Sequence, residues 1–295
     1  MAAHTATHSN RQQKETLMNR LSVAIVVLLM TPSAWADTLT FTVFESAGAD
    51  SAAITPTRDA FRAAVGGGTV AGANGSFGGL RREINWDGVP AGSSDPNPLN
   101  ADFFNVNSPR GVVFSTPGTG FLVSANAGGT TPILFGFAND FQTFSPQKLF
   151  TAVNSNITDV FFFLPGTSTP ATTTAFAMVF VDVETAGSTR LEFFDETNSL
   201  IFSRTALVAG NQGLSFLGAT VENGRISRVR ITSGANTIQS NGVLGNPNDD
   251  IVVMDDFLYA EPGTVQAVPE PASLLLIVVG LSGLAILRKI HRWSV

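Results

Sequence analysis

The stretch Met178-Val-Phe-Val-Asp-Val-Glu184 decides the fold class. Its three valines recur at every second position and therefore share one face of an extended chain, whereas Asp182 and Glu184 fall on the other face. Phe176 and Phe180 make the same region rich in residues that favour strands. We therefore predict a strand with the valine face turned towards a core.

Short apolar or alternating runs of this kind recur outward from that strand, separated by Gly, Asn, Ser, Thr and Pro. The predicted strands are 39–45, 111–115, 121–124, 133–137, 157–164, 175–184, 190–194, 200–204, 214–221, 225–232 and 251–259. Many short strands with turn residues between them indicate an all-β sandwich or barrel. We expect one β-sandwich domain over residues 37–260.

Four finer expectations follow from the same patterns. Residues 191–194 and 200–203 should form a hairpin around the turn 195–199. Val229 and Ile231 should face the core, with the neighbouring arginines opposite. The run 161–164 is apolar at every position and is predicted to be a central strand covered on both faces, with an exposed docking patch as the alternative. One short helix is expected at 56–65, beginning at its proline and ending at the glycines that follow.

The chain start has the features of a secretory signal. Basic residues precede the apolar run 21–30, and Ala34-Trp35-Ala36 then supplies the small-x-small pattern that signal peptidase cleaves. Residues 1–36 are therefore predicted to be a signal peptide, with cleavage specified by Ala34 and Ala36. Met18 is an alternative start, and an uncleaved N-terminal anchor is the alternative to cleavage.

The residue types of the body exclude several classes of function. The three histidines are His4, His8 and His291, and the chain has no cysteine. Residues 37–261 thus lack the groups required for a Ser-His-Asp triad, a cysteine nucleophile or an ordinary zinc site. The same residues hold 21 Asp and Glu against ten Arg and one Lys, a formal charge of −10. An acidic body repels phosphate backbones, so nucleic acid is not an expected partner. Glycoside hydrolysis by two carboxylates needs no histidine, but nothing in the sequence nominates such a pair, so we expect no enzymatic activity.

The chain end combines a stiff step, an apolar run and a basic tip. After a linker at 261–268, Pro269 and Pro271 hold Val268-Pro-Glu-Pro271 extended, including the single charge of Glu270. Residues 272–287 carry no charge, and a helix of that length would span about 24 Å, short of the ~30 Å hydrocarbon core. A basic cluster follows, which favours the cytoplasmic side of a membrane; it consists of Arg288, Lys289 and Arg292. We therefore predict one transmembrane helix at 272–287, either a permanent anchor or part of a signal that is recognised and removed.

This ending resembles the PEP-CTERM sorting signal of exported proteins from Gram-negative bacteria. The segments 82–90, 150–159, 213–218, 225–234 and 252–259 also resemble the bodies of such proteins. The resemblance implies a jelly-roll-like sandwich, recognition of residues 268–271 by an exosortase in the inner membrane, and delivery to the cell surface or the extracellular space. It also implies an association with extracellular polysaccharide and biofilm, and it makes 269–295 a sorting and anchor segment.

Two candidate sites remain in the body. Asp249, Asp250, Asp255 and Asp256 supply oxygen ligands of the kind that calcium prefers. Neighbouring strand residues face opposite ways, so the last two can serve one site only across a β-bulge. The alternative interpretation is a capped turn or a hydrogen-bonded buried carboxylate. Structural calcium is the only cofactor that these residue types suggest.

Trp86 and Asp87 form the second candidate site, because an aromatic ring beside a carboxylate suits a sugar. The alternative interpretation is that Trp86 belongs to the core. The sequence as a whole thus predicts a non-enzymatic surface or matrix protein delivered by its tail. The alternatives are a carbohydrate-binding module, with or without calcium, and a permanently membrane-anchored protein that faces the periplasm.

Overall fold

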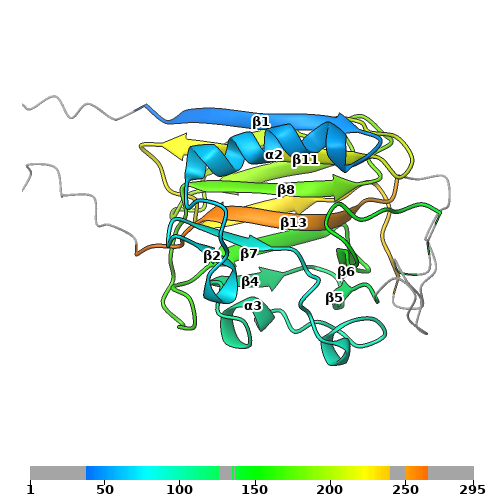
Figure 1. Cartoon of the computed structure of the whole chain (residues 1–295), viewed down its shortest axis with the longest axis horizontal. Coiled ribbons are helices and arrows are strands. Elements are labelled where there is room, and N and C mark those ends of the chain that lie inside the picture. Colours follow the sequence, from blue (N-terminus) through cyan, green and yellow to red (C-terminus); the bar gives the residue numbers. More distant parts are fainter. Residues whose placement is uncertain (1–37, 126–134, 136, 138, 240–249, 265–295) are drawn as a thin grey trace, which may run out of the picture. The chain divides into compact units, whose positions relative to one another are not determined.

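The computed structural model describes residues 38–125, 135, 137, 139–239 and 250–264. Within the chain, Thr38–Val265 form one compact unit, which is the body described below (Figure 1). The expected signal peptide, the Pro-Glu-Pro step, the segment 272–287 and Asp249 all lie outside the described residues. Both terminal helices therefore remain predictions.

The body is built from two antiparallel sheets, which confirms the all-β class (Figure 1). The larger sheet has the order β1 (Thr40–Gly48), β11 (Leu214–Glu222), β8 (Ala175–Val181), β13 (Val253–Ala260), β3 (Arg81–Ile84) and β2 (Ser76–Phe77). It is extended by β6 (Phe150–Val153), which pairs with β13, and by β5 (Gly120–Val123), which pairs with β6. The smaller sheet has the order β10 (Leu200–Thr205), β9 (Arg190–Phe194), β12 (Arg228–Thr232), β7 (Ile157–Phe162) and β4 (Val112–Ser115).

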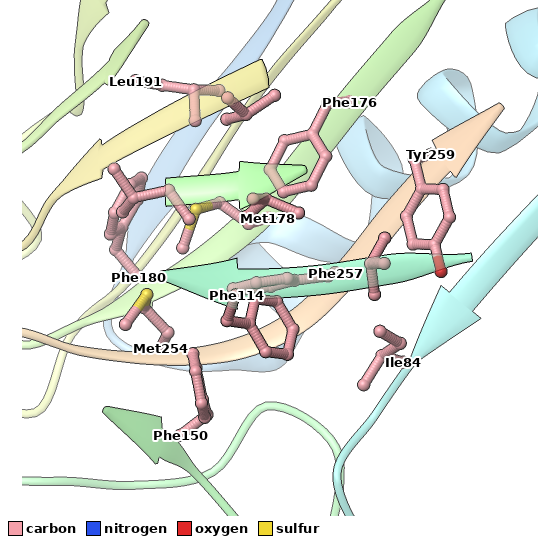
Figure 2. Close-up of a cluster of buried hydrophobic side chains, with 14 of the residues drawn as sticks. Ile84, Phe114, Phe150, Phe176, Met178, Phe180, Leu191, Met254, Phe257 and Tyr259 are labelled. Carbon is pink, nitrogen blue, oxygen red and sulfur yellow. The ribbon is translucent and has the colours of Figure 1, made fainter. Parts of the chain in front are cut away.

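A single hydrophobic cluster joins the two sheets. Phe176, Met178 and Phe180 of β8 project into it from the larger sheet, together with Phe257 of β13 (Figure 2). The smaller sheet contributes alternate residues from β7, β9 and β12, which are Val160, Phe162, Leu191, Phe193, Val229 and Ile231. The sheets therefore pack face to face, and the predicted inward direction of Val229 and Ile231 is confirmed.

The opposite face of the larger sheet is covered by α2 (Ser51–Val65), which lies over β1 and β11 (Figure 1). Ile54 and Phe61 of the helix are completely buried against a second cluster that includes Val179 and Phe216. Because both faces of the larger sheet are covered, all seven residues of β8 are buried. Two other short helical segments and α3 (Phe103–Val106) lie among the loops.

The helix was predicted to begin at its proline, and that prediction is wrong. Helix α2 begins five residues earlier, at Ser51, where Asp50 accepts a hydrogen bond from the backbone N–H of Ala53 (3.2 Å). A capping aspartate fixes a helix start more strongly than a proline does, and Pro56 is accommodated inside the helix. The predicted end is confirmed at Gly66, whose φ is +91°.

The valine pattern of residues 178–184 is only partly confirmed. Val179 and Val181 face α2, but Val183 belongs to the cluster between the sheets. The strand stops at Val181, and Asp182 has a φ of +75°, which breaks the alternation of faces. Asp182 is also buried, so the predicted polar face does not reach solvent there.

The other strand predictions divide in the same way. The hairpin of β9 and β10 is confirmed. Phe162 is buried, but Phe161 is 37 % exposed, so the prediction that 161–164 is covered on both faces is wrong. The predicted strand 133–137 lies mostly outside the described residues, and Phe135 and Phe137 are not in a strand. Strands β2, β3 and β6 were not predicted.

Candidate functional site

Asp255 and Asp256 lie on a β-bulge of β13, at the register shift between Met254 and Phe257. The bulge places both side chains in the interior, where their residues are 0 % and 5 % exposed. Asp255 accepts hydrogen bonds from the backbone N–H of Phe144 (2.6 Å) and the hydroxyl of Ser145 (3.1 Å). The segment around Phe144 is therefore attached to the sheet through this carboxylate.

Burial raises the pKa of both carboxyl groups. For Asp255 burial is the main cause, and the charge of Asp256 raises the pKa further. Burial also raises the pKa of Asp256 to about 6, although hydrogen bonds from Ser145 and Asp255 oppose this shift. A carboxylate pair closed off from solvent cannot reach a glycosidic bond or an incoming sugar.

Asp250 occupies a different position, shortly before the start of β13. It accepts hydrogen bonds from the backbone N–H groups of Glu184 (3.0 Å) and Thr185 (3.2 Å) and from the hydroxyl of Ser188. These contacts fix the turn that follows β8. They correspond to the capped-turn interpretation, in which the oxygens are satisfied by protein donors.

The acidic residues named as calcium ligands are thus not brought together. Asp250 and Asp255 bind separate segments of the chain, and Asp249 lies outside the described residues. Across the described part of the body, no three His, Cys, Asp or Glu side chains form a group that could hold a metal ion. The calcium site remains a prediction without a common location for its ligands.

Trp86 is a core residue, 1 % exposed. Its ring stacks on Phe150 at 4.1 Å with an interplanar angle of 3°. Phe104 and Phe257 pack edge-on against it, at 5.4 Å and 5.1 Å between ring centroids. A ring that stacks on a sugar needs an exposed face, which this position does not provide. Asp87 is partly buried and accepts a hydrogen bond from the backbone N–H of Lys148 (3.2 Å).

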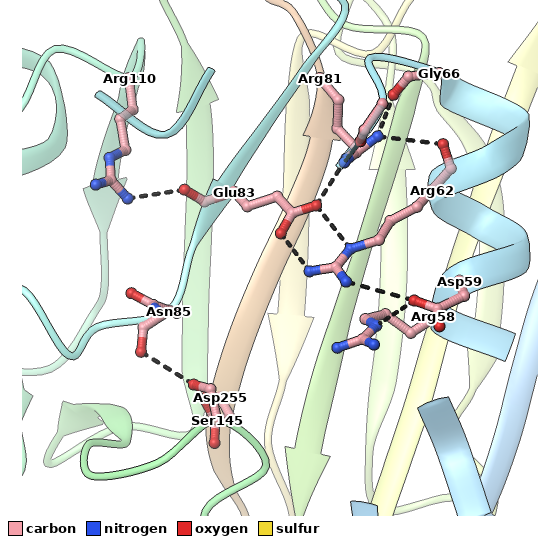
Figure 3. Close-up of polar contacts among 11 residues, drawn as sticks. Arg58, Asp59, Arg62, Gly66, Arg81, Glu83, Asn85, Arg110, Ser145 and Asp255 are labelled. Atoms are coloured by element: carbon pink, nitrogen blue, oxygen red, sulfur yellow. Dashed lines mark hydrogen bonds and ion pairs between the residues drawn. The ribbon is translucent and has the colours of Figure 1, made fainter. Parts of the chain in front are cut away.

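Three arginines near the end of α2 form a site that the sequence analysis did not single out. Glu83 of β3 accepts hydrogen bonds from Arg62 Nε (2.8 Å) and Nη2 (2.5 Å) and from Arg81 Nε (2.7 Å) (Figure 3). Arg81 also donates to the carbonyls of Arg62, Gly66 and Gly68, which fixes the end of the helix to the following loop. The spacing of Arg58 and Arg62, one turn apart on a helix, was the available signal.

A cavity of about 730 Å³ lies beside these arginines. Its wall is formed by α2, by the loop from Gly66 to Ala71 and by Phe77. Arg58, Arg62 and Arg81 all contribute to its lining. This volume is within the range of small-ligand pockets, roughly 300–1,000 Å³.

The outer face of the smaller sheet is a second site that sequence reasoning missed. Adjacent strands place Phe194, Arg228, Phe161 and Val113 in one row across this face. The Arg228 guanidinium lies 3.7 Å above the Phe194 ring. In the next row, Asp159 accepts hydrogen bonds from Arg228 Nη1 (2.8 Å) and from Arg230 Nε (2.9 Å) and Nη2 (2.8 Å).

Comparison with known proteins identifies the tail. Residues 267–289 match the family model of the PEP-CTERM protein-sorting motif. The match contains the predicted recognition residues 268–271, the apolar run, and Arg288 and Lys289 of the basic cluster. No curated protein matches the chain.

The helices of the body are distinct from this tail. Among the residues that the structure describes, none forms a helix with both the length and the apolar character needed to cross a membrane. The localisation of the protein is therefore assigned from the sorting motif. The motif indicates an exported chain with a membrane-anchored sorting signal that an exosortase processes. The chain is a PEP-CTERM sorting domain-containing protein, with its sorting motif at residues 267–289.

Proposed function

We propose that this is a non-enzymatic protein of the cell surface or extracellular matrix, and that its tail is the part that determines where it acts. The observation that carries the proposal is the sorting motif at 267–289. In this proposal the N-terminal signal starts export and is removed by signal peptidase after Ala36. The body then associates with extracellular polysaccharide in a biofilm.

The chemistry of the tail supports a recognition step. Two prolines fix the backbone on either side of Glu270, so an extended peptidase cleft receives a stiff segment with one charge. The uncharged run 272–287 is short for a bilayer, and the basic cluster holds its end on the cytoplasmic side. The exosortase would meet the motif while the chain is still held in the inner membrane.

Replacing the motif tests this proposal. We expect the triple variant P269A/E270A/P271A to be exported normally but to stay in the membrane, with an intact mass that includes residues 272–295. The matched control T264A/V265A/Q266A changes three neighbouring linker residues and should be processed like the natural protein. Release of the triple variant with the mature mass of the natural protein would contradict the proposal.

A permanently anchored protein is the principal alternative. It predicts that the natural protein also keeps residues 272–295 after export. The intact mass of the natural protein from cells separates the two cases, because removal of the tail shortens the chain while anchoring does not.

The strand order supports a jelly-roll assignment for the body. Strands β11-β8-β13-β3 are neighbours in the larger sheet, and β10-β9-β12-β7 are neighbours in the smaller sheet. From β7 onward, the chain passes from one sheet to the other at every connection except the β9–β10 hairpin. Eight strands wound in this way are typical of a jelly roll, and β1, β2, β4, β5 and β6 would be additions to it.

Carbohydrate binding is a second candidate function, and the outer face of the smaller sheet favours it. Phe161 is exposed there beside the paired charges of Asp159 and Arg230. An exposed ring next to hydrogen-bonding groups is the arrangement that stacks and orients a sugar. This face therefore replaces Trp86 as the candidate sugar platform.

A glycan array with the full-length protein tests this second candidate, with and without calcium. We expect Phe161→Ala to abolish the signal, whereas Val106→Ala, at another exposed apolar residue, should leave it unchanged. A calcium requirement would support the calcium-dependent form. A melting temperature that is the same in calcium and in chelator would exclude a structural calcium.

A further inference from the structure

The cavity beside α2 has a positively charged lining on an acidic body. The body carries a formal charge of −10, yet three of its ten arginines line this one cavity. Asp59 is the single acidic residue that lines the cavity. Glu83 does not line it but is bound to Arg62 and Arg81. The three arginines together carry one more charge than Asp59 and Glu83, which leaves one positive charge uncompensated.

Arg58 supplies the available donors. Its Nε donates to Asp59 Oδ1 at 2.9 Å, and its Cζ lies 5.1 Å from the centre of the Phe144 ring. Its two Nη groups make no hydrogen bond to any residue that the structure describes. A guanidinium that is held by Nε and by an aromatic ring keeps its two Nη donors in the planar fork that can bind a carboxylate.

Asp59 shows how such a carboxylate would be held. Its Oδ1 accepts from Arg58 Nε and, at 3.4 Å, from Arg62 Nη1. The Asp59 side chain is 54 % exposed, so it occupies this position from the solvent side. An incoming carboxylate that met the same two arginines would compete with Asp59 and would gain the Nη donors of Arg58.

The remaining wall suits a polar organic molecule rather than a bare ion. The loop from Gly66 to Ala71 offers backbone groups and the Thr69 hydroxyl, and Phe77 offers a ring. Gly68 has open space on its side-chain position, with no atom within 4 Å. Arg81, 1 % exposed, holds this loop in place through the Gly66 and Gly68 carbonyls.

We propose that this cavity binds an organic anion through its carboxylate groups, with Arg58 and Arg62 as the residues that hold the carboxylate and Asp59 as an internal competitor. The size of the cavity admits a ligand of one to three sugar rings. A uronic acid oligosaccharide and a small polycarboxylic acid share the required chemistry. The proposal is independent of the sorting of the tail and of sugar stacking on the smaller sheet.

Calorimetry on the full-length chain in detergent tests the proposal with three probes: trigalacturonate, citrate and the neutral sugar maltotriose. We expect trigalacturonate or citrate to bind, and the binding to weaken as salt is added. The probe that binds more tightly identifies the source of the carboxylate. Arg58→Gln should weaken binding by about tenfold, the effect of one charge-assisted hydrogen bond. Asp59→Asn should strengthen it by removing the competing charge.

A pair of tryptophan substitutions separates occupation of the cavity from a general effect on charge. Ala63 and Ala64 are both exposed, but only Ala63 lines the cavity. Ala63→Trp should therefore abolish binding, and Ala64→Trp should leave it intact, with both variants retaining the melting temperature of the natural protein. The proposal is overturned if neither carboxylate probe binds, if maltotriose binds as well as trigalacturonate, or if Ala63→Trp and Arg58→Gln bind like the natural protein.

Discussion

The helix-covered face of the larger sheet and the open face of the smaller sheet differ in how completely they bury their strand residues, although the strand sequences are similar. Under α2, every residue of β8 is buried. On the open face, β7 buries Phe162 but exposes Phe161. Both strands are apolar along most of their length, so hydrophobicity alone does not decide which is covered on two sides. The presence of a helix over one sheet makes the difference.

The same contrast governs the charged groups. On the covered side, Asp256 is buried and its pKa is raised to about 6, chiefly by burial. On the open side, Asp159 is bound by Arg228 and Arg230. Both carboxylates are largely buried, but the raised pKa of Asp256 is opposed by hydrogen bonds, whereas Asp159 is compensated by ion pairs.

Removing an aromatic ring from each face is expected to give the largest difference. Phe61→Ala leaves a cavity under the helix and should lower the free energy of unfolding by about 3–5 kcal/mol. Phe161→Ala removes a ring from the open face and should cost less than about 1 kcal/mol. Urea denaturation of both variants measures the two values. Equal losses would mean that the open face is covered in solution.

Stability against pH provides the next comparison. Burial is the main cause that raises the pKa of Asp182 from 3.8 to about 7. The charges of Glu184 and Asp250 raise the pKa further, whereas a hydrogen bond from the backbone N–H of Gln212 lowers it. The folded state therefore holds this proton more tightly than the unfolded chain. The resulting stability is complete below pH ~4 and is lost as the pH rises towards about 7.

Asp182→Asn should remove this loss. The amide does not titrate, keeps an acceptor for the Gln212 N–H, and tolerates the φ of +75°. Relative to the natural protein, the variant should gain up to about 4 kcal/mol between pH 4 and 8, since each pKa unit is worth ~1.4 kcal/mol. The control is Asp195→Asn in the exposed β9–β10 turn. Burial raises the pKa of Asp195, but hydrogen bonds from Thr197 and Ser199 outweigh it and lower that pKa, so this variant should lose stability at neutral pH. A flat profile for the natural protein would contradict the prediction.

The ion pairs of the open face should have a smaller effect. Asp159→Ala leaves Arg228, which is 8 % exposed, without its carboxylate and should cost about 1–3 kcal/mol. The exposed pair between Arg204 and Glu45 gives the matched control, and Arg204→Gln should not change the denaturation midpoint. If both substitutions behaved alike, Asp159 would belong with the ordinary surface pairs.

The helix cap is expected to have the smallest effect. Asp50→Ala removes the hydrogen bond to the Ala53 N–H at the start of α2 and should cost about 1 kcal/mol. Because α2 covers one sheet only, hydrogen exchange should increase in α2 and β1 and stay unchanged in β7 and β12. Increased exchange in the smaller sheet would show that the two faces unfold together.

The sequence predicted the strands better than it predicted their environments. The predicted strands include β8, β9, β10, β11 and β13, because these short stretches are apolar or alternate between apolar and polar residues. Strand β3 was missed because Arg81-Arg-Glu-Ile84 is charged, and only the contacts of Arg81 and Glu83 with α2 explain why such residues lie in a sheet. Strand propensity reflects the residue types of the local sequence, whereas these charged residues are stabilised in the sheet by tertiary contacts.

The sites show the same limit. The sorting motif was predictable because its three parts are contiguous in sequence, and the family match covers them. Trp86 and the paired aspartates had suitable chemistry but are buried, which depends on packing between distant segments. The arginine cavity required α2 and β3 to meet, and residues 58, 62 and 81 suggest no such contact when they are read in order.

The place of β13 in the larger sheet has a consequence for the order of events during synthesis. β13 is the last strand of the body, yet it lies between β8 on one side and β3 and β6 on the other. A chain that has emerged only as far as residue 250 therefore lacks the strand that unites both halves of this sheet. The body can close only when residues 253–260 are free to pair. Because the sorting motif begins at residue 267, completion of the sheet and arrival of the motif are nearly simultaneous.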